Sequence, residues 1–389
     1  MAEQRKVVIA EPENSETPLD SVRSWVTPTR LFFVRNHFAV PTIDLATWRL
    51  HVEGRVKQRR TWTWDELNEL PERTVFATVE CAGNGRSFLA ERQAGVQWGA
   101  GAVGHAEWTG VPLGVVLERS GLEPDACEVL FEGADVGTEP DHPEPMHFQR
   151  SLPLSKALHP DTLLATRMNG ELLDATHGHP LRLFVPGWYG VASVKWLQRI
   201  EVIDRPFRGY FQSVKYTVQR RTQGGLDTEV VGPMVPKSEV IRPRPDDVLG
   251  LGGNRVFGVA WAGEDPVSRV QVSTDGGTTW RDATLLGLQA GYSWTMWEYL
   301  WEAESPGEHT ILVRATSAQG RTQPEAHDPL NGGYLIHHPR PVVVRVGVGR
   351  RVVAHSDIDT ILYDMNAYAE ENQRLPLDVE MAFSAGEGI

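Results

Sequence analysis

Hydrophobic and polar positions follow a mixed pattern over residues 30–205, where short β-branched segments alternate irregularly with short amphipathic ones. Apolar spacing of three to four predicts helices over 64–70 and 113–120, the second closed by Gly121. Strands are predicted at 48–54, 74–79, 128–132 and 181–185. Because helices and strands do not alternate regularly, we expect an α+β fold rather than a doubly wound parallel sheet.

The pattern changes after residue 250 to short alternating strands separated by turn residues. These strands are predicted at 255–261, 267–273, 309–316 and 341–346. Their spacing is typical of a β-sandwich. The proline-rich, charged stretch 232–250 that precedes them is interpreted as a linker.

At 389 residues the chain is too long for one ordinary core, so two domains are expected. We place the first at residues 28–232 and the second at 250–347. Residues 1–27 are polar and proline-containing and are predicted to form an N-terminal arm. Residues 348–389 form a C-terminal tail, with a short docking helix expected near 357–365.

The composition excludes several classes of partner. A net charge of −13 argues against nucleic acids and anionic membranes, because both require a basic face. Two cysteines provide no disulfide framework, which allows a reducing compartment. The N-terminus shows no signal peptide, and no apolar run approaches the roughly 20 residues that cross a bilayer. A cytoplasmic protein without membrane partners is therefore expected.

Cys81 is the most informative single residue. The predicted strand 74–79 leads directly to it, two glycines follow at 83 and 85, and Arg86 closes the run. A thiol presented over a glycine turn beside an arginine is well placed to be a thiolate, and thiolates bind soft metals. The alternative is that Cys81 is a small buried hydrophobic residue, as most free cysteines are.

A second signal is a set of strong hydrogen-bonding residues within apolar surroundings. Residues 35–37 (RNH) lie inside the apolar run 31–40, and His177 and Arg182 flank a turn. Ser193 and Lys195 are two apart, so on a strand they share a face. Together they are candidate donors for a buried phosphate.

These polar residues also allow roles that involve no phosphate. Arg35 could pair with one of the many carboxylates of the chain. The chain has no GxGxxG or Walker motif, and its histidines show no HExxH spacing and its cysteines no CxxC pattern. Ordinary nucleotide binding and a zinc site are therefore not favoured.

In their order along the chain, these motifs resemble the sulfite oxidase family of molybdenum enzymes, which includes assimilatory nitrate reductases. Residues 32–37 (FFVRNH) resemble the opening cofactor motif, and 80–86 (ECAGNGR) resemble the motif of the molybdenum-ligating cysteine. Further counterparts are 107–111, 131–135, 168–170, 177–182 and 194–196. Residues 259–261 and 272–280 resemble the family's immunoglobulin-like dimerisation domain. The resemblance covers about residues 28–347.

The resemblance implies a molybdenum–molybdopterin cofactor with Cys81 as the thiolate ligand of the metal. It places cations over the metal at Arg35 and Arg86, with Trp98 lining the pocket. The cofactor itself would be bound by Phe33, Val34, Arg35, Asn36, His37, Asp135, His177, Arg182, Ser193, Val194 and Lys195.

The implied activity is two-electron oxygen-atom transfer, with oxidation of sulfite to sulfate as the leading reaction. The sequence contains no CxxCH haem motif, so no haem is expected and electrons would pass to an external acceptor such as a cytochrome or a quinone-linked carrier. Reduction of S-oxides, N-oxides or another oxyanion is an alternative, and so is a non-catalytic dimeric scaffold.

Three positions depart from the family pattern. The active-site tyrosine aligns with Phe207, the substrate arginine with Gly332, and a pocket lysine with Ala94. This alignment predicts a weakened anion pocket, for which Tyr210 or His105 could compensate.

A homodimer is expected from the resemblance and from an exposed tryptophan-rich stretch at 294–301. The alternative is that these aromatic side chains pack within the sandwich.

Overall fold

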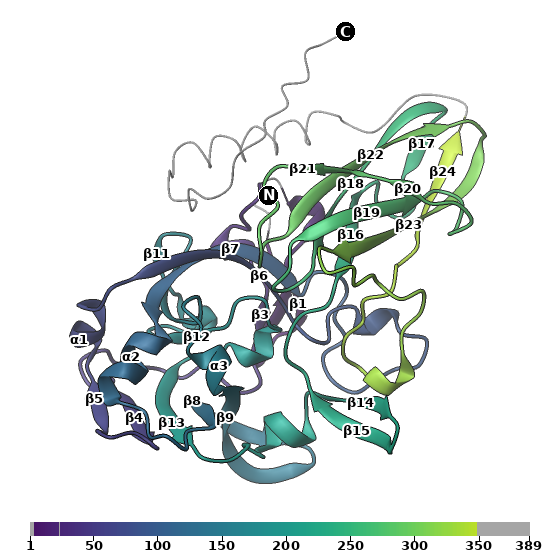
Figure 1. Cartoon of the computed structure of the whole chain (residues 1–389). Coiled ribbons are helices and arrows are strands. Elements are labelled where there is room, and N and C mark those ends of the chain that lie inside the picture. The colour runs from purple at the N-terminus through teal and green to yellow at the C-terminus, as the bar shows by residue number, and fades with distance from the viewer. Residues whose placement is uncertain (1–3, 23, 348–389) are drawn as a thin grey trace.

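The computed structural model describes residues 4–22 and 24–347, which form two β-rich regions lying side by side (Figure 1). The α-helices are short, and the longest, α2, spans Leu113–Ser120. Helices therefore contribute less than an α+β assignment suggests, because the amphipathic segments end after one or two turns. The expected helix near 357–365 and the tail 348–389 lie outside the described residues.

The predicted helices are confirmed, and their ends have clear local causes. Helix α1 (Trp64–Asn68) begins with a capping box in which Thr63 Oγ1 accepts from the Glu66 amide and Glu66 accepts from the Thr63 amide. Helix α2 ends at Gly121, whose φ of 68° suits glycine. A third helix, α3, spans Leu154–Ala157.

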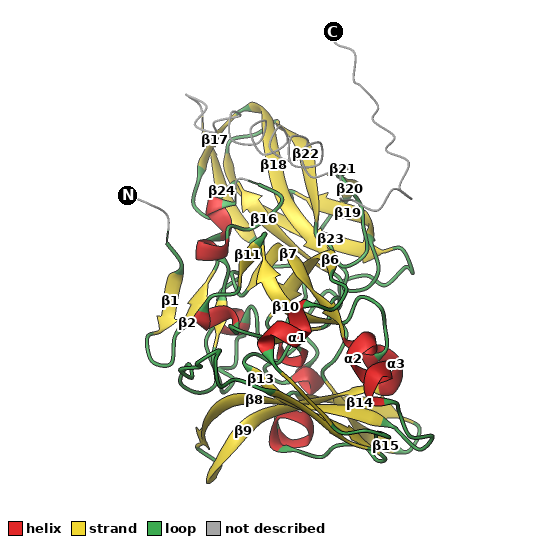
Figure 2. Ribbon diagram, turned by 90° about the vertical axis from the view of Figure 1, so that its left-hand side faces the viewer, coloured by secondary structure: helices red, strands yellow, loops and turns green. Residues whose placement is uncertain are grey.

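Two five-stranded sheets build the first region (Figure 2). The first contains β11 (Glu171–Leu172), β10 (Leu163–Met168), β7 (Val103–Pro112) and β6 (Arg73–Glu80) in that order, with β12 (Arg182–Phe184) paired to β10. The second runs β5 (Arg60–Trp62), β4 (Leu50–Gly54), β13 (Leu197–Ile203), β8 (Glu128–Glu139) and β9 (His142–Pro153). Buried apolar residues of both sheets, such as Val111 and Phe131, share one core. All four strands predicted for this region are present.

Part of the expected N-terminal arm is built into the first region. Strands β1 (Lys6–Ile9), β2 (Asn14–Glu16) and β3 (Val34–Arg35) form a small sheet. Residues 14–17 are buried, and Asn14 Oδ1 accepts from the amide of Asn36 at 3.1 Å. This segment therefore supports the cofactor motif at 32–37.

The second region consists of two sheets with a common apolar core. One sheet contains β16 (Lys237–Arg242), β18 (Gly252–Trp261), β22 (Thr295–Ala303) and β21 (Thr284–Leu286). The other contains β17 (Val248–Gly250), β24 (Val342–Gly347), β23 (Gly307–Ser317), β19 (Val267–Ser273) and β20 (Arg281–Asp282). The core between them includes Val256 and Trp297 from the first sheet and Val270, Val313 and Val344 from the second.

The interpretation of 232–250 as a linker is corrected by the strand pairing. Strand β16 pairs with β18 and β17 pairs with β24, so both belong to the sheets of the second region. Prolines at 236 and 243 flank β16 because proline is tolerated at strand ends. The strand pairing favours a start of the second region near residue 237.

The expected exposure of the tryptophan-rich stretch is wrong. Trp294, Trp297 and Trp301 are all buried, and the last two pack between the sheets of the second region. Strand alternation sends only the neighbouring Leu300 outward, with 72% of it exposed.

Within the described residues, the structure contains no helix with the length and hydrophobicity needed to cross a membrane.

Candidate cofactor site

One cavity brings most of the predicted cofactor residues together with Cys81. Segments far apart along the chain supply its wall: the predicted residues that line it are Phe33, Val34, Arg35, Asn36, His37, Cys81, Asp135, His177, Arg182, Ser193 and Lys195.

Cys81 lies at the first position after β6, and only 7% of it is exposed. Its amide donates to Ala102 O at 2.9 Å, and its carbonyl accepts from the Asn84 amide at 2.8 Å. Gly85 then takes a φ of 95°, which lets the chain turn away within four residues. The turn therefore holds the thiol at the cavity wall by backbone hydrogen bonds.

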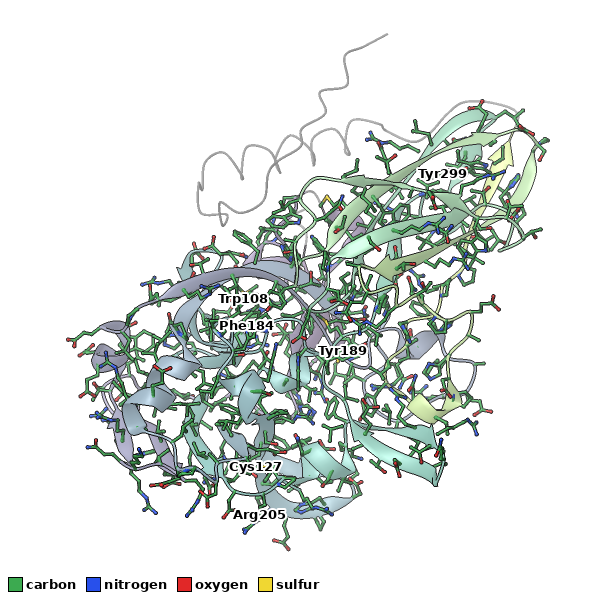
Figure 3. The ribbon with its side chains drawn as sticks, viewed as in Figure 1. Trp108, Cys127, Phe184, Tyr189, Arg205 and Tyr299 are labelled. Carbon is green, nitrogen blue, oxygen red and sulfur yellow. The ribbon has the colours of Figure 1, made fainter. Side chains whose placement is uncertain are left out.

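Three cations of the cavity are held by neutral groups. Arg182 Nη1 reaches His177 O at 3.4 Å, and its guanidinium lies 5.1 Å from the ring of Trp108, which stacks on Phe184 (Figure 3). Lys195 Nζ donates to Asn36 Oδ1 and, at 2.8 Å, to Thr176 O. Arg35 Nη1 donates to Asn14 Oδ1 and to Asn36 O.

No ion pair involving Arg35, Arg182 or Lys195 is found among the residues that the structure describes. Taking a cation out of water without an anion is unfavourable by several kcal/mol. The cavity is therefore complementary to an anionic ligand.

Polar atoms without protein partners reinforce this conclusion. Asn36 Nδ2, His177 Nε2 and Arg182 Nε are buried and have no hydrogen-bond partner in the described part of the chain. All three residues line the same cavity, and leaving such groups unpaired is unfavourable by about 1–3 kcal/mol each. Asn36 Nδ2 and Arg182 Nε can donate to phosphate oxygens, and the unprotonated Nε2 of His177 can accept from the polar edge of a ring. Cys81 adds a ligand for a soft metal.

Two histidines of the cavity are kept neutral. Burial lowers the pKa of His177, opposed by Asp174, which hydrogen-bonds to Nδ1 at 2.9 Å. Burial, with Arg35 and Lys195 adding to it, lowers the pKa of His37 well below its usual value. The carboxylate of Asp174 fixes the tautomer of His177 and leaves Nε2 as the group available to a ligand.

Asp135 predicts a pH dependence of stability. Burial raises its pKa to about 6, against the opposing attraction of Lys195. The pKa of Asp135 in the folded protein is therefore above its unfolded value of about 3.9. Because of this difference, the stability that Asp135 contributes is fully present below pH ~4 and is lost as the pH rises through 6. We expect Asp135→Asn to stabilise the cofactor-free protein above pH 7 by up to about 2–3 kcal/mol, with the gain vanishing near pH 4. Urea denaturation at several pH values measures it.

Asp275→Asn is the matched control. Hydrogen bonds from Thr279 lower the pKa of Asp275 to about 2, so its stabilising contribution is present at neutral pH and lost in acid. Asp275→Asn should therefore destabilise the protein at pH 7, whereas Asp135→Asn should stabilise it. Equal responses of the two variants would contradict the assignment of Asp135.

Three predicted site residues do not line the cavity. Arg86 donates through Nε and Nη2 to Gly333 O, at 3.0 and 2.8 Å, and through Nη1 to Val96 O. Trp98 and Val194 are fully buried in apolar clusters. Arg86 thus joins the cysteine turn to the second region, and the other two pack the core.

The proposed substitutes for a missing phenol also lie elsewhere. Tyr210 hydrogen-bonds to Asp141 at the surface. His105 is buried between Trp25 and Trp294, with ring centroids 4.5 and 5.6 Å away. Burial lowers its pKa to about 3, so it is neutral. Neither residue lines the cavity, so neither compensates there.

Tyr216 is a cavity-lining residue that the sequence did not predict. It lines the cavity, and its hydroxyl lies 2.8 Å from His37 Nε2. Its φ of +54° is unusual for a bulky residue and typical of functional sites. Phe207, Ala94 and Gly332 do not line the cavity, and Tyr216 is the tyrosine found there among the described residues. The sequence signal that could have indicated Tyr216 is its place directly before the hairpin of β14 (Thr217–Thr222) and β15 (Gly225–Val230).

Comparisons with known proteins agree with this site. Residues 37–211 match the oxidoreductase molybdopterin binding domain, and residues 230–331 match the Mo-co oxidoreductase dimerisation domain. Mitochondrial sulfite oxidase of Drosophila melanogaster is 35% identical over 81% of this chain and 58% of its own length. Sulfite oxidase of Gallus gallus is 34% identical over 82% of this chain and 72% of its own. The chain thus spans about three fifths of the length of the first of these relatives.

Among solved structures, the sulfane dehydrogenase SoxCD from Paracoccus pantotrophus superposes with a TM-score of 0.76 at 28% identity, covering 89% of this chain and 91% of that one. Fold and site thus define an oxidoreductase with a molybdopterin-binding domain. The chain belongs to the sulfite oxidase family of molybdenum oxidoreductases.

Proposed function

We propose that this protein oxidises sulfite to sulfate by two-electron oxygen-atom transfer and passes the electrons to an external acceptor. The observation that carries the proposal is a cavity that Cys81 shares with Arg35, Arg182 and Lys195, of which Arg182 is buried and forms no ion pair in the described residues. Overall, water supplies the oxygen atom, and two electrons and two protons leave. A cytochrome or a quinone-linked carrier is the acceptor that we propose.

The molybdopterin cofactor supplies the oxygen-atom transfer when it is bound, and the protein binds and orients it. Cys81 is the group that would ligate the metal. Arg182, Lys195 and His177 would hold the phosphate and the polar edges of the pterin.

Tyr216 and His37 are the proton-bearing pair on the same wall. His37 is neutral at pH 7, so its tautomer sets the direction of the hydrogen bond between Nε2 and the Tyr216 hydroxyl. When Nε2 carries the proton, it donates to the phenol oxygen, and the phenol proton is available to a bound oxyanion.

Replacing Tyr216 by phenylalanine should lower kcat/KM for sulfite by roughly 10–100-fold, since one hydrogen bond to a charged group is lost. The effect should appear mainly in KM if the phenol binds the anion in its ground state. Steady-state assays with an artificial electron acceptor measure it. The surface variant Tyr210→Phe is the control, because its hydroxyl donates to Asp141 outside the cavity. Equal values of kcat/KM for Tyr216→Phe and Tyr210→Phe would show that Tyr216 takes no part in sulfite oxidation.

Metal content decides the main proposal. We expect about one molybdenum per chain in protein from a molybdate-fed host, and a change in its absorbance within seconds of mixing with sulfite. Folded protein that carries no molybdenum would refute the cofactor assignment. Bound molybdenum that does not respond to sulfite would refute the substrate alone.

A second candidate substrate is a sulfane sulfur atom, which the similarity to a sulfane dehydrogenase favours. Oxygen transfer in the reverse direction, to an S-oxide or N-oxide, is the other alternative. Assays in both directions with artificial electron carriers separate the three. A non-catalytic scaffold is disfavoured, because the buried Arg182, with Nε unpaired in the described residues, would destabilise it without benefit.

We also propose that the second region is an immunoglobulin-like domain and that the protein is a homodimer, supported by the match of residues 230–331 to a dimerisation domain. Light scattering at micromolar concentration should give twice the chain mass of 43.3 kDa, and a monomer would contradict it. The cytoplasmic location stays a prediction.

A further inference from the structure

A buried charged cluster lies behind Cys81, on the side away from the cofactor cavity. Glu80 Oε1 accepts from Lys237 Nζ at 2.8 Å and from Asn84 Nδ2 at 3.1 Å, and its Oε2 accepts from Trp261 Nε1 at 2.9 Å. All four residues are buried, with at most 3% of each exposed. None of the four lines the cavity, so the cluster is distinct from the cofactor site.

The cluster joins the two regions of the molecule. Glu80 is the last residue of β6 in the first region, whereas Lys237 lies on β16 and Trp261 on β18 of the second. Lys237 and Trp261 are directly paired across these strands. Tyr189 is labelled in Figure 3 between the two regions. Burial, and after it the negative charge of Glu80, raises the pKa of the Tyr189 hydroxyl well above the usual value.

Glu80 and Cys81 are consecutive, so their side chains point to opposite sides of the extended chain. The thiol reaches the cofactor cavity, and the carboxylate reaches the second region. Any displacement of Glu80 is therefore transmitted to Cys81 through a single peptide unit.

The same cluster also fixes the turn that follows the thiol. Lys237 Nζ donates to Asn84 O at 3.2 Å, and Asn84 Oδ1 accepts from the Ala102 amide at 3.0 Å. The Asn84 amide donates to Cys81 O. Glu80 and Lys237 thus hold both ends of the segment 80–84, and Cys81 lies between them.

We propose that Glu80 is a positioning residue for Cys81, and that Lys237 and Trp261 hold it so that the second region sets the place of the metal-ligating thiol. The ligand role of Cys81 rests on the proposed function. Lys237 also balances the negative charge of Glu80 within this buried cluster.

The test is the reactivity of Cys81 in cofactor-free protein. Iodoacetamide is the probe, and the background is Cys127→Ser, since Cys127 is an exposed cysteine at the far edge of the first region (Figure 3). The variant is Glu80→Leu with Lys237→Met, which removes the pair without leaving one charge buried alone. We expect Cys81 to alkylate about tenfold faster, because the turn opens more readily once its hydrogen bonds are lost.

The matched control is Arg255→Met with Glu298→Leu, which removes a partly buried ion pair between β18 and β22. It should leave the alkylation rate of Cys81 unchanged. Thermal denaturation verifies that both double variants are folded. Molybdenum content of protein from a molybdate-fed host should fall severalfold in the first variant only.

An alkylation rate equal to that of the control would overturn the positioning role. If the double variant does not fold, Trp261→Phe is the second test, because it removes the bond from Nε1 to Glu80 and keeps an aromatic ring beside Lys237. It should raise the rate by a smaller factor, and no rise would overturn the proposal. If the protein without these substitutions lacks molybdenum, the proposed function is refuted. The alkylation rates of Cys81 would still test the positioning role of Glu80.

Discussion

Cys81→Ser is expected to abolish turnover, lowering kcat by more than about a hundredfold, which is the upper end of what substitutions around metal ligands cause. A serine hydroxyl stays protonated at neutral pH and is a harder ligand than a thiolate, so it replaces the sulfur poorly. The pterin should remain bound, because the cations that would hold it are separate residues at the same cavity. Fluorescence of the released pterin and metal analysis of the same sample measure both expectations.

The control for this variant is Cys127→Ser, the other free cysteine. It is exposed, so its replacement should leave activity and metal content unchanged. Full activity of Cys81→Ser would exclude the thiol as a ligand. Loss of both pterin and metal would place Cys81 among the residues that retain the whole cofactor.

Arg182→Met is expected to move cofactor binding and protein stability in opposite directions. Arg182 is 7% exposed, and burial lowers its pKa to about 10. Its removal deletes a charged hydrogen bond to the cofactor, so retention should weaken by roughly 10–100-fold. The cofactor-free variant should be more stable by about 1–2 kcal/mol, because a buried cation is lost and only its contact with Trp108 and a long hydrogen bond to His177 O are given up.

Arg150→Met is the matched control for Arg182. Arg150 is equally buried, and burial likewise lowers its pKa to about 10. However, Arg150 donates to the carbonyls of Phe211 and Val231, which would lose their partner. The control should therefore destabilise the cofactor-free protein by about 1–3 kcal/mol. Thermal denaturation measures the stability of both variants. If Arg182→Met destabilises the cofactor-free protein, the charge of Arg182 stabilises the fold and is not reserved for the cofactor.

Local sequence signals were sufficient for most single elements. The capping box at Thr63 and the glycine at 121 are contacts between near neighbours, so they can be recognised in a short window. The alternating strands of the second region were recognised for the same reason. The segment 237–242 was missed because its prolines indicated a break, whereas its pairing partner, β18, begins ten residues after it ends.

The cofactor residues were recognised from the sequence as separate motifs, and the fold brings them to one cavity. Arg86, Trp98 and Val194 were included from the family resemblance. Val194 lies between the cavity residues Ser193 and Lys195, but side chains alternate in direction along an extended chain. Tyr216 was missed because an alignment of short motifs cannot show which aromatic residue reaches the cavity.

By itself the sequence determined the family, the thiol at position 81 and the cations at 35, 182 and 195, since each depends on residue type and local order. The tertiary structure alone decided which of these side chains share a cavity and that a tyrosine at 216 faces His37. It also revealed that Lys237 and Trp261, more than 150 positions away along the chain, hold the residue next to Cys81. These contacts join distant segments through packing, which no local pattern encodes.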